Sequence, residues 1–305
     1  MGGTVRTTAV APIALDGPEQ PPAAGRAIPT SDQIKQRPTG VFLPVVVSRH
    51  SASGRVRLES FESEALGRRL QYLVYLPPGY EAGAQRYPVL YLLHGYGATL
   101  HQWADYGFFA AAHRMIGSGE IAPLIVITPQ GDLSYWVNHS NGGERWGDYL
   151  ALDLVGHVDG SFRTIAAAHG RAVGGQSMGG FGALQQAMSR PDRFSAVGAH
   201  SPSLRSPGDP RDPSPDYLGD AEYFAGLDPI ILSRTREGAR QVRIWIDHGD
   251  ADYWRPRVEV LHQTLVDRGI AHEYHVWPGA HTAEYFQAHF ADYLSFYNRA
   301  FSGAR

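Results

Sequence analysis

One short stretch of the chain combines a β-type run, a glycine-rich turn and a helical segment around a single serine. It runs from Arg171 to Leu184 and contains Gly175-Gln-Ser-Met-Gly179, a G-x-S-x-G pattern centred on Ser177. Glycines at these positions allow a strand to turn sharply into a helix, which leaves the serine in a strained conformation at the apex. The pattern predicts Ser177 as a nucleophile; the alternative is a glycine-rich turn with an incidental serine.

Short apolar runs, each long enough for one buried strand, alternate with helical stretches along most of the chain. The expected strands are 87–93, 124–128, 171–173, 194–199, 241–246 and 271–277, and the expected helices are 100–118, 146–162, 181–188, 255–268 and 286–301. This alternation indicates an α/β fold with a mostly parallel central sheet and helices on both faces. Residues 54–61 and 68–76 alternate polar and apolar side chains, which predicts an antiparallel N-terminal edge.

The ends of the chain and its proline-rich part define the expected domain organisation. Residues 1–39 are rich in Pro, Ala, Gly and Thr and lack hydrophobic periodicity, so they predict a disordered N-terminal tail. Residues 40–305 then form one α/β domain. A proline-rich insertion around 201–236 interrupts it, and whether that segment covers the site stays open.

Composition excludes several classes of protein. The 305 residues carry a net charge of −3 without a long basic run, so nothing supports a nucleic-acid partner. The absence of cysteine excludes disulfides, thiolate metal sites and a cysteine nucleophile. No apolar run approaches the roughly 18 residues of a membrane span, and no signal peptide is visible. We therefore expect a soluble protein, with the cytoplasm favoured over export; the oligomeric state is open.

A serine nucleophile needs a base and an orienting carboxylate, each in a loop beyond the carboxyl end of a strand. The loop after the last strand offers His281, which follows the turn 278–280. The loop after the strand before it offers three carboxylates: Asp247, Asp250 and Asp252. The order serine, acid, histidine is the one that G-x-S-x-G hydrolases use. We choose Asp252 and His281 as the partners of Ser177.

Other residues compete for these roles. Asp250 is the alternative acid, because either it or Asp252 could cap the helix that begins near Arg255. His94 is a possible base, but it precedes Ser177 in the chain, so we expect it to brace its loop. His248 lies beside the acid loop and is a weaker competitor. Another two histidines lie three apart within a strand, on opposite faces, where they do not form a metal pair: His272 and His275.

Ester hydrolysis also requires N–H donors for the oxyanion. We assign one donor to the backbone N–H of Met178, directly after the nucleophile. The second is the N–H of Tyr96, in the Gly95-Tyr-Gly97 loop, although a plain tight turn would have the same sequence. Four polar or aromatic side chains are candidates for contacting substrate and could equally be core or surface residues: Trp103, Trp136, Asn138 and Tyr217.

From about Val56 to Phe296, the sequence resembles the "Putative esterase" or esterase D family of α/β-hydrolases. This group includes feruloyl and acetylxylan esterases, S-formylglutathione hydrolases and mycolyltransferases of the antigen 85 type. The matching stretches are Tyr91-Leu-Leu-His-Gly-Tyr-Gly97, Trp146-Gly-Asp-Tyr149, Arg163-Thr164, Gly175-Gln-Ser-Met-Gly-Gly-Phe-Gly-Ala-Leu184, Gly249-Asp-Ala-Asp252 and Gly279-Ala-His281.

The resemblance implies an α/β-hydrolase fold and a serine esterase that uses no metal or organic cofactor. It places the acid on Asp252 through a G-x-x-D pattern, and Trp103 fills the family's aromatic position after the HG loop. Two features depart from the family: the cysteine often found near the acid loop is absent, and the stretch 202–217 matches nothing. A small-molecule ester is the expected substrate. Acyl transfer to an alcohol, peptide hydrolysis and a non-catalytic binding role are the alternatives.

Overall fold

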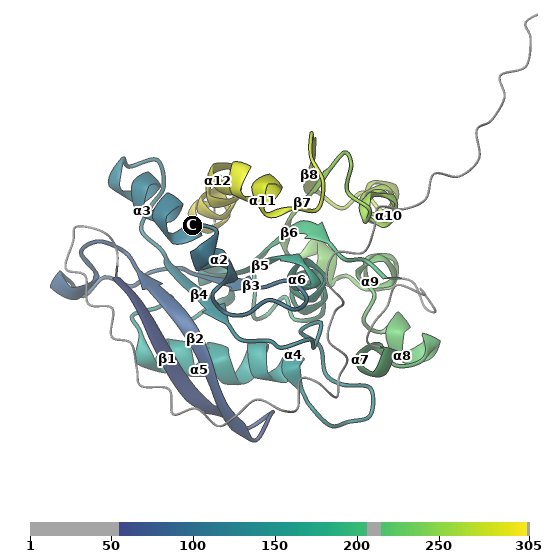
Figure 1. The fold of residues 1–305 in the computed structure, drawn as a ribbon, viewed down its shortest axis with the longest axis horizontal. Helices are drawn as coiled ribbons and strands as arrows, with labels where there is room; N and C mark the ends of the chain where they lie inside the picture. Colours follow the sequence, from purple (N-terminus) through teal and green to yellow (C-terminus); the bar gives the residue numbers. More distant parts are fainter. Residues whose placement is uncertain (1–54, 206–214, 304–305) are drawn as a thin grey trace, which may run out of the picture. The chain divides into compact units, whose positions relative to one another are not determined.

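The computed structural model of the protein describes residues 55–205 and 215–303. The expected tail (1–39) and the middle of the proline-rich insertion lie outside these ranges. An eight-stranded sheet, with strand order β1-β2-β4-β3-β5-β6-β7-β8, runs through the described part (Figure 1). The strands are β1 Arg55–Ser63, β2 Arg68–Leu76, β3 Val89–Leu93, β4 Ile125–Pro129, β5 Arg171–Ser177, β6 Ala196–Pro202, β7 Arg243–Gly249 and β8 His272–Trp277.

The direction of the strands confirms the predicted fold class. Strand β1 pairs antiparallel with β2, and β2 pairs antiparallel with β4. From β4 to β8 every pairing is parallel. The carboxyl ends of β3, β5, β6, β7 and β8 therefore meet along one edge of the sheet, where open α/β sheets place their sites.

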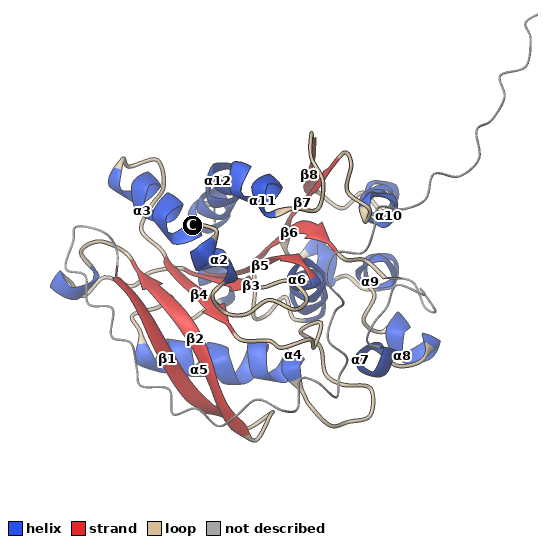
Figure 2. Cartoon of the chain, in the orientation of Figure 1, coloured by secondary structure: helices blue, strands red, loops and turns tan. Residues whose placement is uncertain are grey.

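Helices cover both faces of the sheet, and Figure 2 shows them in blue around the red strands. They are α2 Gln102–Asp105, α3 Phe108–Gly117, α4 Trp146–Asp148, α5 Val155–Ser161, α6 Met178–Ser189, α7 Pro215–Leu218, α8 Ala221–Ala225, α9 Pro229–Thr235, α10 Arg255–Asp267, α11 Ala283–Ala288 and α12 Phe290–Ser302. Helices α5, α6, α9 and α10 share one apolar cluster, and α3, α11 and α12 share the other. The fully buried strand β3 alternates between these clusters: Tyr91 faces the first, and Leu90 and Leu92 face the second.

Three expected helices are interrupted. The expected helix 100–118 breaks at Gly107, whose φ of 90° is left-handed and begins α3 anew. A π-helical turn, Tyr149–Leu154, separates α4 from α5. The last helix divides at His289, where the backbone leaves the helical region. Each interruption is a local change of backbone angle or hydrogen bonding, which an apolar pattern does not specify.

The loop after β3 is held by a buried histidine. The Nδ1 atom of His94 donates to the carbonyl of Gly95 at 2.8 Å, and its Nε2 accepts from the N–H of Gly131 at 2.9 Å. The bond to Nε2 requires the neutral ring, because a protonated Nε2 could not accept it. Burial, the largest effect, lowers the pKa of His94 to about 4, although the Gly95 carbonyl and the charge of Asp132 act in the opposite direction. His94 therefore braces the loop, as its position in the chain predicted.

This pKa generates a prediction about stability. Between pH 6.5 and 4 the unfolded chain protonates His94 while the folded protein does not, so stability falls as the pH is lowered. For a folded pKa near 4 the loss is about 3 kcal/mol. Between pH 6.5 and 4, the free energy of unfolding should therefore fall by about 3 kcal/mol less in His94→Gln than in the wild type. Urea unfolding at the two pH values measures this difference. His169→Gln, at an exposed histidine, should keep the wild-type dependence; an equally steep decline in His94→Gln would contradict the prediction.

Candidate active site

Loops at the carboxyl ends of five parallel strands surround a pocket of about 320 Å³. Three residues expected at the site line it: Ser177, His281 and Tyr96. The complete lining is Gly95, Tyr96, Gln102, Tyr106, Gln176, Ser177, Ser203, Arg205, Tyr253, Trp254, His281, Thr282, Ala283 and Phe286. The pocket is thus a mixed polar and aromatic cavity with a serine and a histidine in its wall.

Ser177 occupies the sharp turn between β5 and α6. Its φ of 54° and ψ of −119° are strained for a residue with a side chain, and such strain persists only where the surroundings impose it. The surroundings here are backbone: a Cβ on Gly175 would lie 2.5 Å from the carbonyl carbon of Gly179, and one on Gly179 would lie 2.4 Å from the Leu93 oxygen. Only glycine permits this approach, so these two glycines hold Ser177 at the apex.

Two backbone segments lie beside Ser177. Met178 is the first residue of α6, so its N–H has no acceptor within the helix and is directed out of the helix N-terminus. On the other side is the loop after β3, where a Cβ on Gly95 would lie 3.5 Å from the Cβ of Ser177. The structure thus brings Met178 and the Gly95–Tyr96 segment to the side of the pocket where Ser177 lies.

His281 and Asp252 form a hydrogen-bonded pair. The Nδ1 atom of His281 donates to Oδ2 of Asp252 at 2.8 Å, and Asp252 is only 4 % exposed. Burial alone would raise the pKa of Asp252, but hydrogen bonds from His281, Ser201 and the Trp254 N–H, with the charge on His281, hold it below its ordinary value. Asp252 therefore stays ionised and fixes Nδ1 as the protonated ring nitrogen.

The other two aspartates of the loop have different partners. Oδ1 of Asp250 accepts from the N–H of Gly279 at 2.9 Å, so this carboxylate holds the turn that precedes His281. Asp247 is fully buried and accepts from four side chains, those of His200, Trp245, Tyr285 and Tyr293. The structure places Asp252, and neither neighbour, against His281.

Two residues at the end of β6 were missed by the sequence reasoning. Ser201 donates from Oγ to Oδ2 of Asp252 at 2.5 Å, and His200 binds Asp247 with Nδ1 at 2.7 Å. Both are fully buried. The one signal in the sequence is a pair of polar residues that directly follows the apolar run 194–199. That signal does not say which carboxylate each side chain reaches.

The competing histidines lie outside the pocket. His248 is buried and bonds the hydroxyl of Tyr274 at 2.7 Å, and His272 bonds His262 at 2.8 Å. His275 stacks on Trp245 with ring centroids 3.9 Å apart. No group of three or more His, Asp or Glu that could hold a metal gathers within residues 55–205 and 215–303.

The structure does not bring the four expected substrate contacts to this pocket. Trp103 and Trp136 are fully buried; their indole N–H groups donate to the carbonyls of Leu93 and His94. Both indoles therefore belong to the core beneath the loop after β3, which corrects the expectation. Asn138 accepts from the N–H of Asp148, and the hydroxyl of Tyr217 donates to Glu144. Neither residue lines the pocket, which is instead bordered by Tyr106, Tyr253, Trp254 and Phe286.

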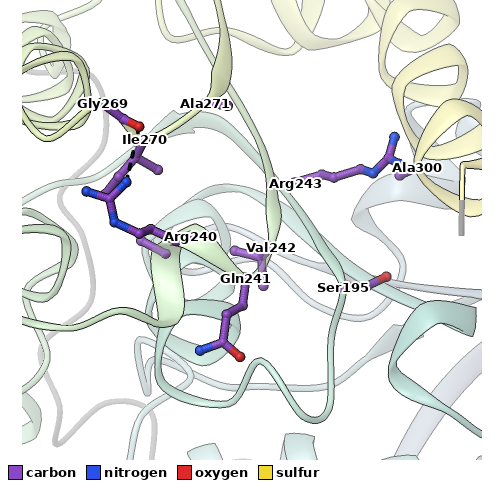
Figure 3. A pocket seen from close by; sticks show the side chains of 10 residues that line it. Ser195, Arg240, Gln241, Val242, Arg243, Gly269, Ile270, Ala271 and Ala300 are labelled. Carbon is purple, nitrogen blue, oxygen red and sulfur yellow. Dashed lines mark hydrogen bonds between the residues drawn. The ribbon is translucent and has the colours of Figure 1, made fainter.

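A second depression, of about 460 Å³, lies at the amino ends of β7 and β8 (Figure 3). Its lining includes Ser195, Arg240 and Arg243 but no histidine or carboxylate. In the view of Figure 3 the two arginine side chains extend to opposite sides. The depression therefore offers no base to activate its serine, and we place the candidate chemistry in the pocket of Ser177.

Comparison with known proteins places the chain among esterases. An esterase of Mycobacterium tuberculosis is 32% identical over 160 residues, which cover 51% of this chain and 34% of the relative. An endo-1,4-beta-xylanase/feruloyl esterase of Xylanibacter ruminicola is 28% identical over 237 residues, covering 73% of this chain and 30% of the relative. The chain therefore spans about a third of the length of these two relatives.

Solved structures share the fold. A ferulic acid esterase superposes with a TM-score of 0.75 at 24% identity, covering 82% of this chain and 100% of that one. An S-formylglutathione hydrolase from Agrobacterium tumefaciens has a TM-score of 0.71 at 20% identity, and the match covers 85% of this chain and 100% of that one.

In the described ranges no helix has the length and apolar character needed to cross a membrane. The model of the "Putative esterase" family matches residues 63–297, and the chain belongs to that family.

Proposed function

We propose that the protein is a serine carboxylic-ester hydrolase that works through an acyl-enzyme. The observation that carries this proposal is the shared pocket of Ser177 and His281, with Asp252 bonded to the far side of the imidazole. A strained serine at a helix N-terminus, a histidine and a buried carboxylate are the parts that acyl transfer requires. Membership of an esterase family supports the same reaction.

We infer a role for each group from this geometry. Because Nδ1 of His281 donates to Asp252, Nε2 is the unprotonated nitrogen that takes the proton of Ser177 as its oxygen attacks the acyl carbon. Asp252 stabilises the imidazolium that results. The N–H groups of Met178 and Tyr96 bind the oxyanion. His281 then protonates the leaving alcohol, and it next activates the water that releases the acid.

The walls of the pocket suggest the class of ester. A volume of about 320 Å³ suits a small acyl group, and Tyr253 and Trp254 offer flat rings beside it. The ring of Tyr253 lies 5.0 Å from that of His281 and is more than half exposed. We propose acetyl, feruloyl or other small acyl esters as substrates. Feruloyl esterases occur among the relatives and the solved structures, and they support a feruloyl ester as the substrate.

The nucleophile is tested with a panel of acetyl, butyryl, feruloyl and S-formylglutathione thioester substrates. We expect the wild type to turn over at least one of them and Ser177→Ala to lose about 1,000-fold or more in kcat, because the attacking oxygen is gone. Ser189→Ala removes a hydroxyl at the far end of the same helix and should keep wild-type rates. Undiminished turnover by Ser177→Ala would exclude the proposed mechanism.

The acid assignment predicts unequal effects of two matched variants. Asp252→Asn should lower kcat about 1,000-fold or more, because an amide no longer holds the imidazole tautomer or stabilises the imidazolium. Asp250→Asn keeps an oxygen that can accept from the N–H of Gly279, so it should lose less than about tenfold. Steady-state kinetics on the best ester measures both. A larger loss for Asp250→Asn would refute the choice of Asp252.

A further inference from the structure

The end of strand β6 contacts both the nucleophile and the acid of the proposed mechanism. The N–H of Ser203 donates to the carbonyl of Ser177 at 3.0 Å. Two residues earlier, the hydroxyl of Ser201 donates to Oδ2 of Asp252 at 2.5 Å. The pairing of β5 with β6 shifts register at this point, so that Ser177 lies opposite Pro202. One three-residue segment, 201–203, therefore links the two arms of the site.

Ser201 is held in an unfavourable backbone conformation. Its φ of 44° lies in the left-handed region, which residues with a side chain rarely adopt, and it is fully buried. The preceding residue anchors it: His200 bonds Asp247 with Nδ1 at 2.7 Å and the hydroxyl of Tyr297 with Nε2 at 3.1 Å. This left-handed turn directs the Ser201 hydroxyl at the carboxylate, and backbone strain of this kind persists where the surrounding structure imposes it.

The hydroxyl shares an acceptor with the catalytic histidine. Oδ2 of Asp252 accepts from both Ser201 and His281, while Oδ1 accepts from the N–H of Trp254 at 2.7 Å. An ionised carboxylate has no proton to donate, so Ser201 is the donor. The distance from Oγ to Oδ2 is typical of a charge-assisted O–H···O⁻ bond. The hydroxyl therefore fixes the carboxylate's rotation and competes with the imidazole for its charge.

We propose that Ser201 is a positioning residue of the active site, which orients Asp252 and limits how strongly that carboxylate holds protonated His281. It does not touch substrate, since its side chain is fully buried. The proposal rests on the proposed function, because it assigns Ser201 a role through His281. Other titratable or charged groups near the pair are Asp250 in the same loop, Tyr253 beside the imidazole, Tyr285 in α11 and Arg205 in the pocket wall, and the change at Ser201 replaces none of them.

Removing the hydroxyl should have two effects. The carboxylate of Asp252 loses one of the three hydrogen bonds that it accepts, so the imidazole is held less rigidly and kcat falls. The full charge of Oδ2 also becomes available to the imidazolium, which stabilises the protonated, inactive form of His281. The acid limb of kcat/KM should therefore move to higher pH, whereas a purely structural defect would lower the rate without moving that limb.

The experiment measures pH–rate profiles for the wild type, Ser201→Ala and Ser201→Gly on the best ester of the panel. In both variants we expect kcat to fall about tenfold and KM to change little. The acid limb of the kcat/KM profile should move to higher pH by about half a pH unit to one pH unit. The glycine variant tolerates the left-handed backbone, so it keeps the test valid if the alanine variant does not fold. Ser195→Ala, which removes a hydroxyl just before the other end of β6, should match the wild type.

Ser177→Ala is measured in parallel to separate this inference from the function on which it rests. If Ser177→Ala abolishes turnover while both Ser201 variants keep the wild-type limb, the hydrolase mechanism stands and the role of Ser201 is refuted. A fall in kcat with an unmoved limb refutes it as well. If Ser177→Ala retains activity, the proposed function itself fails.

Discussion

The close backbone contact between β3, β5 and α6 is the constraint on which the site depends. The carbonyls of Leu93 and His94 lie where any side chain on Gly179 would be, so α6 begins directly against the end of β3. This contact produces the strained turn at Ser177 and brings the N-terminus of α6 beside the Gly95–Tyr96 loop. The proposed nucleophile and its proposed oxyanion donors therefore depend on one packing arrangement rather than on separately placed side chains.

A second constraint is the pair of buried carboxylates at the end of β7, both of which bind side chains at the end of β6. Burying an unpaired charge is costly, and the structure surrounds each carboxylate with donors. Asp247 accepts from four side chains that tie β6, β7, α11 and α12 together. Asp252 accepts from Ser201, His281 and the Trp254 N–H. Asp247 therefore holds these strands and helices together, and Asp252 orients the imidazole of His281.

Much of this could be predicted from the sequence. Apolar runs such as 87–93 identified the parallel strands, and the glycines around Ser177 identified the turn. Periodicity does not predict the direction of side chains at the ends of strands. This direction depends on a register shift after Gln176 and on the left-handed backbone of Ser201. The same limit explains Trp103 and Trp136: the sequence places them after the strands 87–93 and 124–128, but it does not decide between the pocket and the core. The break at Gly107 likewise depends on one backbone angle.

Ser177 is proposed to form an acyl-enzyme with the help of His281, and this intermediate can be trapped. The protein is mixed with p-nitrophenyl acetate, quenched with acid during turnover, digested and examined by mass spectrometry. We expect a burst of p-nitrophenol and an acetyl group on the peptide that contains Ser177, and we expect His281→Ala to slow the burst. Turnover with the acetyl group on another residue, or turnover without any acylated peptide and without a burst, would contradict it.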